Sequence, residues 1–361
     1  MTSNRTQVIE LIEQDKIAEH HLNQALQLSG VTPNTQRWFQ FVNQLLAWFG
    51  GLALMFSVLF FIAYNWHEMG RFAKFMLVEV LIVLSVIGYY FLDKKARKTQ
   101  QTEGSALSEP SKAPFSIVSQ FKVSDTVAKI PLLMASIFFG VLLALFGQTY
   151  QTGADPWQLF FNWALLIIPW VIIGRLSALW MVWVGLLNLA VLLYFLEFGG
   201  VGLFGHKDLN ALWSVFSINA IALLCWELMS RRYTWLTVRW APRVLASVSG
   251  YSITWLTLLV IVDANYIGVS RYDLSGENLV PVIVWPIWVG LMYIAYRRFR
   301  QDLFMLAGTL LSANIIIISF LTMHLLNDIH ELGFLLMSFT TIGMAAGSAM
   351  WLRNINKEWQ S

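Results

Sequence analysis

Two carboxylates of this 361-residue chain fall inside apolar blocks that are each about as long as a membrane-crossing helix. An acidic side chain at the centre of such a helix costs about 2.5–3.5 kcal/mol on insertion scales, so each one needs a partner. Glu227 has Arg231 one turn later, and this spacing predicts an ion pair. Glu79 has only apolar neighbours one turn away, so it must face another helix, face a hydrated cavity or stay protonated. Proton or cation coupling, substrate contact and a structural interhelical hydrogen bond all remain open for Glu79.

Two polar clusters mark the ends of apolar blocks and complete the candidate ligand or coupling site. They consist of Tyr64, Asn65 and Trp66 after the first block, and of Gln148, Tyr150, Gln151 and Asp155 between the third and fourth blocks. The second cluster interrupts an apolar run with hydrogen-bonding side chains and two glycines. Irregular backbone at membrane depth is tolerated only where protein or a wet cavity satisfies it, which favours an outward-facing site at a depth similar to that of Glu79. The alternative is a capped turn with an aromatic anchor.

No sequence motif indicates catalysis, a cofactor or a metal. The G-x-S-x-G, H-E-x-x-H, Walker and Rossmann patterns are all missing from the sequence, so we expect no catalytic residues and no enzyme. The single cysteine, Cys225, excludes an internal disulfide and a cysteine-based metal site. Two histidines and two acids lie close together at His324, Asp328, His330 and Glu331, but such a group is common by chance, and we expect no metal there.

The composition identifies the solvent of these residues as lipid. Hydrophobic residues make up 57% of the chain and charged residues only 12%, against about 25% charged in soluble domains. This excludes a disordered chain, an ordinary cytosolic enzyme and a nucleic-acid partner. The pattern predicts an all-α polytopic helical bundle in a lipid bilayer, with a tight hairpin dividing the fourth and fifth spans near Arg175. The ten predicted spans are 45–64, 72–92, 130–147, 157–174, 176–196, 209–229, 244–262, 280–296, 303–321 and 333–352.

Three segments are expected outside the spans. Residues 1–44 are mostly polar, lack the apolar region of a cleavable signal peptide and predict two short amphipathic helices. They act either as a docking or sensing module or as a surface cap that orients the first span. Residues 93–129 predict a flexible basic loop, and residues 353–361 a short tail.

The basic residues predict the orientation of the chain. With the N-terminus in the cytoplasm, 20 of the 24 Lys and Arg residues fall in inside segments. This is the positive-inside pattern, and it places both termini in the cytoplasm.

Small and polar residues within the spans predict helix contacts. Gly343 and Gly347 form a G-x-x-x-G pattern in the last span, which favours close packing either within the chain or across a homodimer. Four asparagines are expected to hydrogen-bond neighbouring helices. They are Asn162, Asn188, Asn219 and Asn314.

The two polar clusters also carry a family resemblance. The A-Y-N-W at residues 63–66 and the G-Q-x-Y-Q-x-G-A-D at residues 147–155, followed by Trp157, resemble the bacterial membrane family known as domain of unknown function 2157. The resemblance is clearest over residues 5–195. It implies a polytopic bacterial inner-membrane protein with a cytoplasmic N-terminus that works alongside other membrane proteins, and it names no substrate.

Two functions are therefore expected from the sequence. The first is a non-enzymatic subunit, scaffold or sensor of a cell-envelope membrane complex. The alternative is a secondary transporter or channel that uses Glu79 beside the outward-facing polar clusters.

Overall fold

The described part of the chain is built from helices. The computed structural model describes residues 11–12, 14, 16–17, 21–29, 35–106, 125–198, 209–266, 280–325 and 330–360, and no strand occurs in these ranges. Ten of the helices are long and apolar enough to cross a bilayer, so the predicted all-α bundle of ten spans is confirmed. Lipid offers no hydrogen-bond partner, and a helix satisfies the backbone groups of such segments internally. The chain divides into two compact units, residues 1–155 with 165–179 and residues 156–164 with 180–361.

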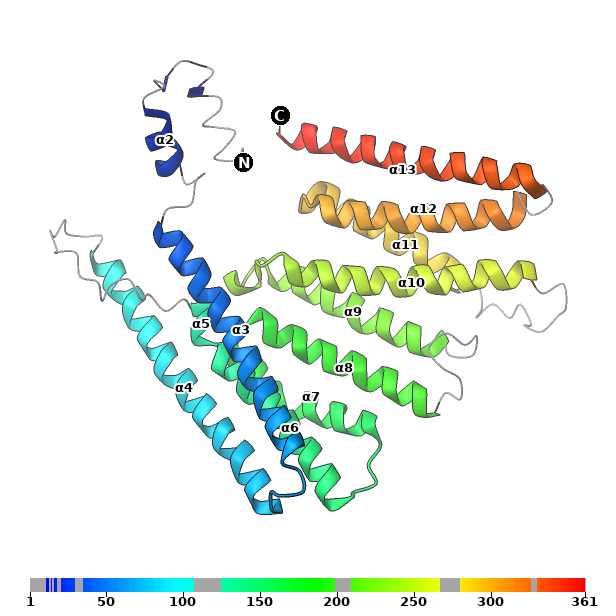
Figure 1. Ribbon diagram of the computed structural model, residues 1–361. Coiled ribbons are helices and arrows are strands. Elements are labelled where there is room, and N and C mark those ends of the chain that lie inside the picture. The colour runs from blue at the N-terminus through cyan, green and yellow to red at the C-terminus, as the bar shows by residue number, and fades with distance from the viewer. Residues whose placement is uncertain are drawn as a thin grey trace. The chain divides into compact units, whose positions relative to one another are not determined.

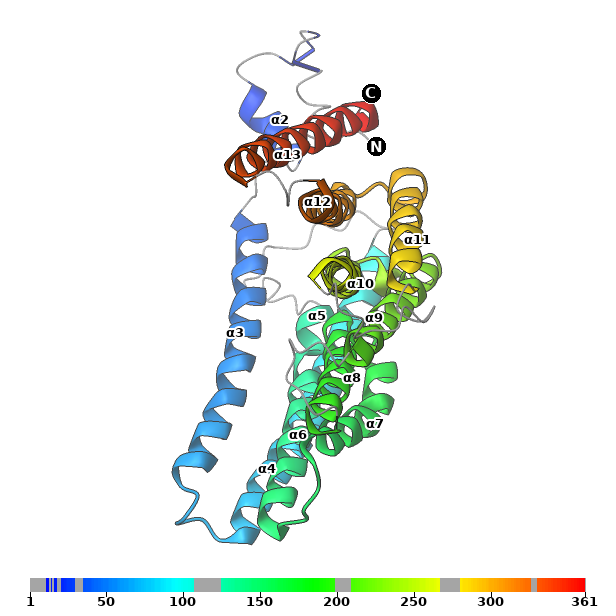
Figure 2. The same ribbon diagram turned by 90° about the vertical axis from the view of Figure 1, so that its right-hand side faces the viewer.

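The first unit is organised around α6. Its helices are α2 (Leu22–Leu28), α3 (Thr35–Tyr64), α4 (Arg71–Ala106), α5 (Asp125–Ala128), α6 (Ile130–Tyr150) and the second part of α7 (Pro156–Gly174). Both α3 and α4 pack against α6. The α3–α4 turn and the last turn of α6 lie at the same end of this unit (Figures 1 and 2). Its core is formed by Met55, Ile62, Val78, Phe138 and Leu145.

Two segments of the first unit can be compared with the sequence prediction beyond the spans themselves. The predicted loop begins at residue 93, yet α4 continues to Ala106. Its Lys, Arg, Ala and Gln residues favour helix, and Arg97 forms an ion pair with Asp93 one turn earlier, at 2.7 Å. At the N-terminus, α2 lies where the second short helix is predicted, whereas the first predicted helix falls largely outside the described residues.

A sharp break separates the fourth and fifth long helices, as the sequence predicts. Helix α7 ends at Gly174, and α8 (Ser177–Phe198) begins three residues later. Arg175 between them has a φ of 45°, in the left-handed region. A left-handed residue directly after a helix is a common way of ending it.

The second unit is organised around α10. It contains most of α8 together with α9 (Leu209–Met229), η3 (Thr234–Leu236), α10 (Trp240–Tyr266), α11 (Val280–Ile294), its π-helical continuation η5 (Ala295–Phe299), α12 (Leu303–Leu325) and α13 (His330–Gln360). Helix α10 packs against α9, α11 and α12, and α13 lies along α12 (Figures 1 and 2). The core includes Leu245, Ile253 and Leu256 of α10, Trp288 of α11 and Leu306 of α12.

Helices α10 and α12 run in the same direction. Near their starts Arg243 contacts Asp302, and further along Thr254 contacts Ser312. Helices two apart in an alternating series of crossings must be parallel, so this arrangement agrees with the predicted order of spans. The starts of α10 and α12 therefore lie at the same end of the second unit as the end of η5.

Candidate functional site

The first polar cluster forms the turn between α3 and α4. The Asn65 side-chain amide donates to the Phe61 carbonyl at 2.8 Å. The backbone carbonyl of Asn65 accepts hydrogen bonds from the backbone N–H groups of Glu68 and Met69, at 3.1 and 2.9 Å. These bonds satisfy groups that the end of a helix leaves without partners. Asn65 therefore has a clear structural role, whereas the Tyr64 side chain is 90% exposed.

Trp66 holds a buried cation that the sequence does not single out. The Lys74 ammonium lies 3.6 Å from the centre of a Trp66 ring, and Lys74 is only 7% exposed. A desolvated cation over a tryptophan gains about 2 kcal/mol, which offsets part of the cost of burying the charge. The contact ties the α3–α4 turn to the first turn of α4. Only the aromatic residue at one end of the turn and the lysine at the other hint at it in the sequence.

The second polar cluster forms the turn between α6 and α7. Helix α6 continues three residues beyond the predicted span, to Tyr150. Gln151 and Gly153 adopt left-handed conformations, with φ of 46° and 65°. Asp155 is extended and precedes Pro156, which begins α7. The side chains of Gln148 and Gln151 are exposed.

Tyr150 connects this second cluster to α4. Its ring centre lies 6.1 Å from that of Phe75 on α4 and 4.9 Å from that of Phe146 on α6. Phe75 precedes Glu79 by one helical turn, so the two residues lie on the same side of α4. The structure thus brings Tyr150 to α4, the helix that carries Glu79.

Glu79 itself is exposed on an apolar helix face. Phe72, Met76, Val83 and Tyr90 share the exposed side of α4 with it. Within the described ranges, Glu79 makes no hydrogen bond or ion pair. Among the described residues, the carboxylate therefore has no interhelical partner of the kind that its position in an apolar span demands.

A groove of about 880 Å³ lies between α3 and α4, beside the turn that joins these two helices. Ser57, Asn65 and Glu68 are its polar lining residues, and most of the others are apolar. Of the predicted site residues, only Asn65 lines it. Glu79, Gln148, Tyr150 and Asp155 line neither this groove nor the cavity in the second unit described below.

Glu227 forms an ion pair with a different arginine from the one predicted. The prediction of Arg231 is wrong, because Glu227 pairs with Arg300 at the end of η5. It also accepts a hydrogen bond of 2.9 Å from the Tyr296 hydroxyl. Arg300 in turn donates to Ser230 at 2.8 Å. The folded chain supplies a partner from a neighbouring helix, where local spacing indicates one from the next turn.

Asp302 is a buried charge that sequence reasoning missed. Its side chain is 1% exposed and accepts two bonds from the Arg243 guanidinium, at 3.2 and 3.1 Å. The Nε of Arg239 lies 3.7 Å from the same carboxylate. Asp302 also accepts from the backbone N–H of Phe304 at 3.1 Å and so caps α12. An Asp directly before an apolar run is the sequence signal that could have revealed it.

Three of the four asparagines that are expected to hydrogen-bond neighbouring helices do so. The Asn219 amide donates to the Asn188 side-chain oxygen at 2.7 Å, which joins α9 to α8. The Asn314 amide donates to Ser348 at 3.0 Å, which joins α12 to α13. Asn162 is exposed, and no hydrogen bond of its side chain occurs among the described residues.

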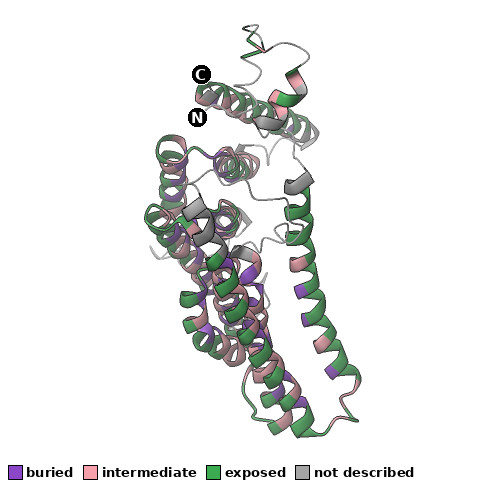
Figure 3. Cartoon of the chain, turned by 90° about the vertical axis from the view of Figure 1, so that its left-hand side faces the viewer, coloured by how far each residue is buried: buried purple, intermediate pink, exposed green. Residues whose placement is uncertain are grey.

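The small-residue pattern of α13 has no partner in the described chain. Gly343 and Gly347 are both exposed, and a Cβ atom built on either one would meet nothing within 4 Å. Helix α13 is exposed along most of its length (Figure 3). The expected close packing within the chain is therefore not seen in the described ranges.

The described residues contain no group of three or more His, Cys, Asp or Glu side chains that could hold a metal ion. Asp328 of the weighed histidine and acid group lies outside these residues, as do the side chains of the other three.

Comparison with protein families agrees with the resemblance seen in the two polar clusters. Residues 10–180 match the family model described as predicted membrane protein (DUF2157). The match includes both clusters and Glu79, and it confirms the predicted family for this part of the chain. Comparisons with curated proteins and with solved structures found no match. The DUF2157 description supports a membrane protein and specifies no reaction or ligand.

Proposed function

We propose that this protein is a non-enzymatic subunit of a membrane-protein complex, in which another protein chain covers the Glu79 face of α4. The observation that carries this proposal is the exposed Glu79 side chain, which has no partner within the described residues. A carboxylate left in hydrocarbon costs about 2.5–3.5 kcal/mol. A polar group on a neighbouring chain would remove most of that cost by accepting or donating a hydrogen bond.

Helix α13 supports the same role. Gly343 and Gly347 leave a shallow, exposed surface on which another helix backbone can approach closely. That helix belongs either to a second copy of this chain or to a different membrane protein. Two separate faces, one on α4 and one on α13, would suit a scaffold that contacts more than one neighbour.

We place the protein in the bacterial inner membrane with both termini in the cytoplasm. The 20 basic residues in alternate segments support this orientation. The second unit adds further support, because Arg239, Arg243 and Arg300 gather at one end of it.

Site-specific photocrosslinking in native membranes tests the proposal. A photoreactive amino acid at position 79 is expected to form a covalent adduct with a second protein chain. The matched control is position 84, because Leu84 is also exposed on α4 but lies on a different side of the helix from Glu79. Adducts from position 79 that contain only lipid or only this same chain would contradict the proposal.

Substitution distinguishes a polar contact from simple apolar packing. Glu79→Gln keeps hydrogen-bonding capacity and should retain the neighbour during purification in mild detergent, whereas Glu79→Leu should lose it. Recovery of the wild-type protein only as a lone monomer would count against a stable complex.

The alternative is a secondary transporter or channel for a small solute or ion. The contact between Tyr150 and Phe75 favours it, because it brings a hydroxyl-bearing side chain to α4 one turn from Glu79. In proteoliposomes this function predicts that Glu79→Gln alters proton- or ion-coupled flux while the protein still folds. Flux that is unchanged by the substitution would exclude a coupling role for Glu79.

A further inference from the structure

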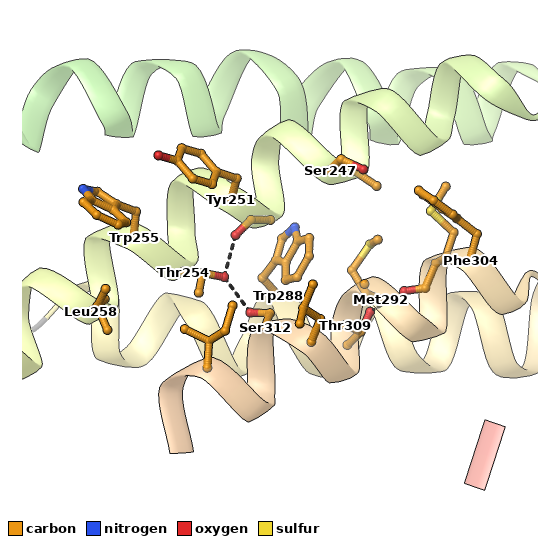
Figure 4. A pocket seen from close by; sticks show the side chains of 16 residues that line it. Ser247, Tyr251, Thr254, Trp255, Leu258, Trp288, Met292, Phe304, Thr309 and Ser312 are labelled. Carbon is orange, nitrogen blue, oxygen red and sulfur yellow. Dashed lines mark hydrogen bonds between the residues drawn. The ribbon is translucent and has the colours of Figure 1, made fainter. Parts of the chain in front are cut away.

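A cavity of about 340 Å³ lies between α10, α11 and α12, and it is independent of the face on which the proposed function rests. Trp288 forms part of its wall from α11, while Tyr251 and Trp255 enter from α10 (Figure 4). The Trp288 ring sits directly on Gly250, where a Cβ atom would be 2.6 Å from the ring. Gly308 of α12 also lines the cavity, and a Cβ atom there would meet nothing within 4 Å. Gly250 thus allows the Trp288 ring to pack directly against the α10 backbone, and Gly308 leaves space open in the cavity.

The serine and threonine hydroxyl groups around the cavity already have partners, and that of Ser247 donates to the Arg243 carbonyl. Thr254 and Ser312 share a hydrogen bond of 2.6 Å, and Thr254 also donates to the Gly250 carbonyl (Figure 4). Ser312 accepts from the Trp285 indole at 2.9 Å, and Thr309 donates to the Met305 carbonyl. Because these groups are satisfied, the cavity offers an apolar surface rather than a polar binding site. An alkyl chain matches that surface better than a sugar or an ion does.

One end of the cavity lies beside a cationic group. Phe304 lines the cavity, and the Arg243 guanidinium lies 5.3 Å from the centre of its ring. Arg239 and Arg243 share the single carboxylate of Asp302, so the trio keeps one positive charge. The Arg243 side chain is 40% exposed and can still reach an external anion. The apolar cavity therefore ends at a site that attracts negative charge.

The length of the cavity suits one leaflet of a bilayer. Its lining runs along α10 from Ala246 to Leu258, which is about 18 Å at 1.5 Å per residue. Half of a typical hydrocarbon core is about 15 Å thick. An acyl chain that enters beside the arginines would extend over this distance.

We propose that this cavity binds one acyl chain of an anionic phospholipid, whose phosphate contacts Arg239 and Arg243. Aliphatic surface on the chain replaces the empty space beside Gly308. The phosphate neutralises the charge that Asp302 leaves on the two arginines, and basic pockets between membrane helices are a recurrent type of lipid headgroup site.

Native mass spectrometry of the full-length, delipidated protein in detergent tests this proposal. The probes are phosphatidylglycerol, phosphatidylcholine and glycerol phosphate, which separate the contributions of headgroup charge and acyl chain. We expect phosphatidylglycerol to bind more tightly than phosphatidylcholine, by about fivefold for each contributing arginine. Glycerol phosphate alone should not be retained. Equal binding of the two lipids, or retention of glycerol phosphate, would overturn the proposal.

Two pairs of variants locate the site. Gly308→Phe fills the open space and should weaken phosphatidylglycerol binding by about tenfold, since it displaces at least two methylene groups. Gly290→Phe is its control, because Gly290 also has open space but does not line the cavity. Arg239→Gln should weaken binding by about fivefold. Its control Arg232→Gln, at an exposed basic residue, should leave binding unchanged.

The second pair keeps the test decisive if Gly308→Phe does not fold. Wild-type affinity in Arg239→Gln would overturn the headgroup assignment, and wild-type affinity in a folded Gly308→Phe would overturn the cavity assignment. A loss of affinity as large in Gly290→Phe as in Gly308→Phe would also contradict it.

Discussion

Arg243 and Asp302 form a two-bond ion pair that joins the first turn of α10 to the start of α12. The carboxylate is almost completely buried, whereas the guanidinium reaches the surface. Because Asp302 also caps α12, the same side chain fixes the direction of one helix and its attachment to another. The cavity proposed for a lipid chain begins directly beyond this pair, at Phe304.

Removal of the Asp302 charge should destabilise the second unit. Asp302→Asn leaves a capping oxygen but abandons two arginines beside an uncharged group, and breaking a buried pair in this way costs about 3 kcal/mol. Glu358→Gln is the control, because the Glu358 side chain of the Arg297–Glu358 pair is 60% exposed, and loss of its charge should produce little change. The midpoint of thermal unfolding in detergent measures both. Equal midpoints for the two variants would show that the buried pair is not a principal contact.

The two cavity glycines should respond oppositely to alanine. Gly250→Ala places a Cβ atom 2.6 Å from the Trp288 ring, and such overpacking costs about 1–3 kcal/mol. Gly308→Ala meets nothing within 4 Å and should be neutral or stabilising by up to about 1 kcal/mol, because alanine favours helix. Thermal unfolding of the two proteins gives the comparison. A neutral Gly250→Ala would mean that Trp288 can move away at little cost.

The contact between Lys74 and Trp66 should stabilise the α3–α4 turn. Trp66→Leu removes the aromatic face from a buried ammonium and should cost about 2 kcal/mol, whereas Trp66→Tyr should retain part of the interaction. Limited proteolysis at the turn measures the local effect, and the leucine variant should be cleaved faster. Equal cleavage of the leucine and tyrosine variants would exclude an aromatic contribution.

The positions of the helices and the break between the fourth and fifth spans followed from the apolar runs, but the ends of several other helices did not. The left-handed residue Arg175 lies in the short break that divides the fourth and fifth predicted spans. Helix α4 instead continues through a polar segment, because helix propensity does not depend on hydrophobicity. Apolar length therefore predicts where a helix crosses lipid better than where the helix ends.

The polar partners of the site were harder to predict, because they come from distant parts of the sequence. Glu227 has an arginine one turn away, yet it pairs with Arg300 on another helix. Lys74 reads as an ordinary charge near the end of the second predicted span until the fold places Trp66 against it. The turn at Asp155 could be foreseen, because proline and glycine act locally. Local chemistry is visible in sequence, and pairing across helices requires the fold.

The hydrogen bond between Asn219 and Asn188 provides a test of such pairing inside the membrane. The two amides lie 2.7 Å apart and join α9 to α8. Interhelical hydrogen bonds in membranes have measured couplings of about 0.6 kcal/mol, with a maximum of about 1.7. A double-mutant cycle with Asn219→Leu and Asn188→Leu should therefore give a coupling in this range, measured from unfolding free energies in detergent. Because Asn219 is 2% exposed, its single substitution should cost more than that of the exposed Asn162, which makes no such bond among the described residues. Strictly additive single effects would mean that the two asparagines act independently.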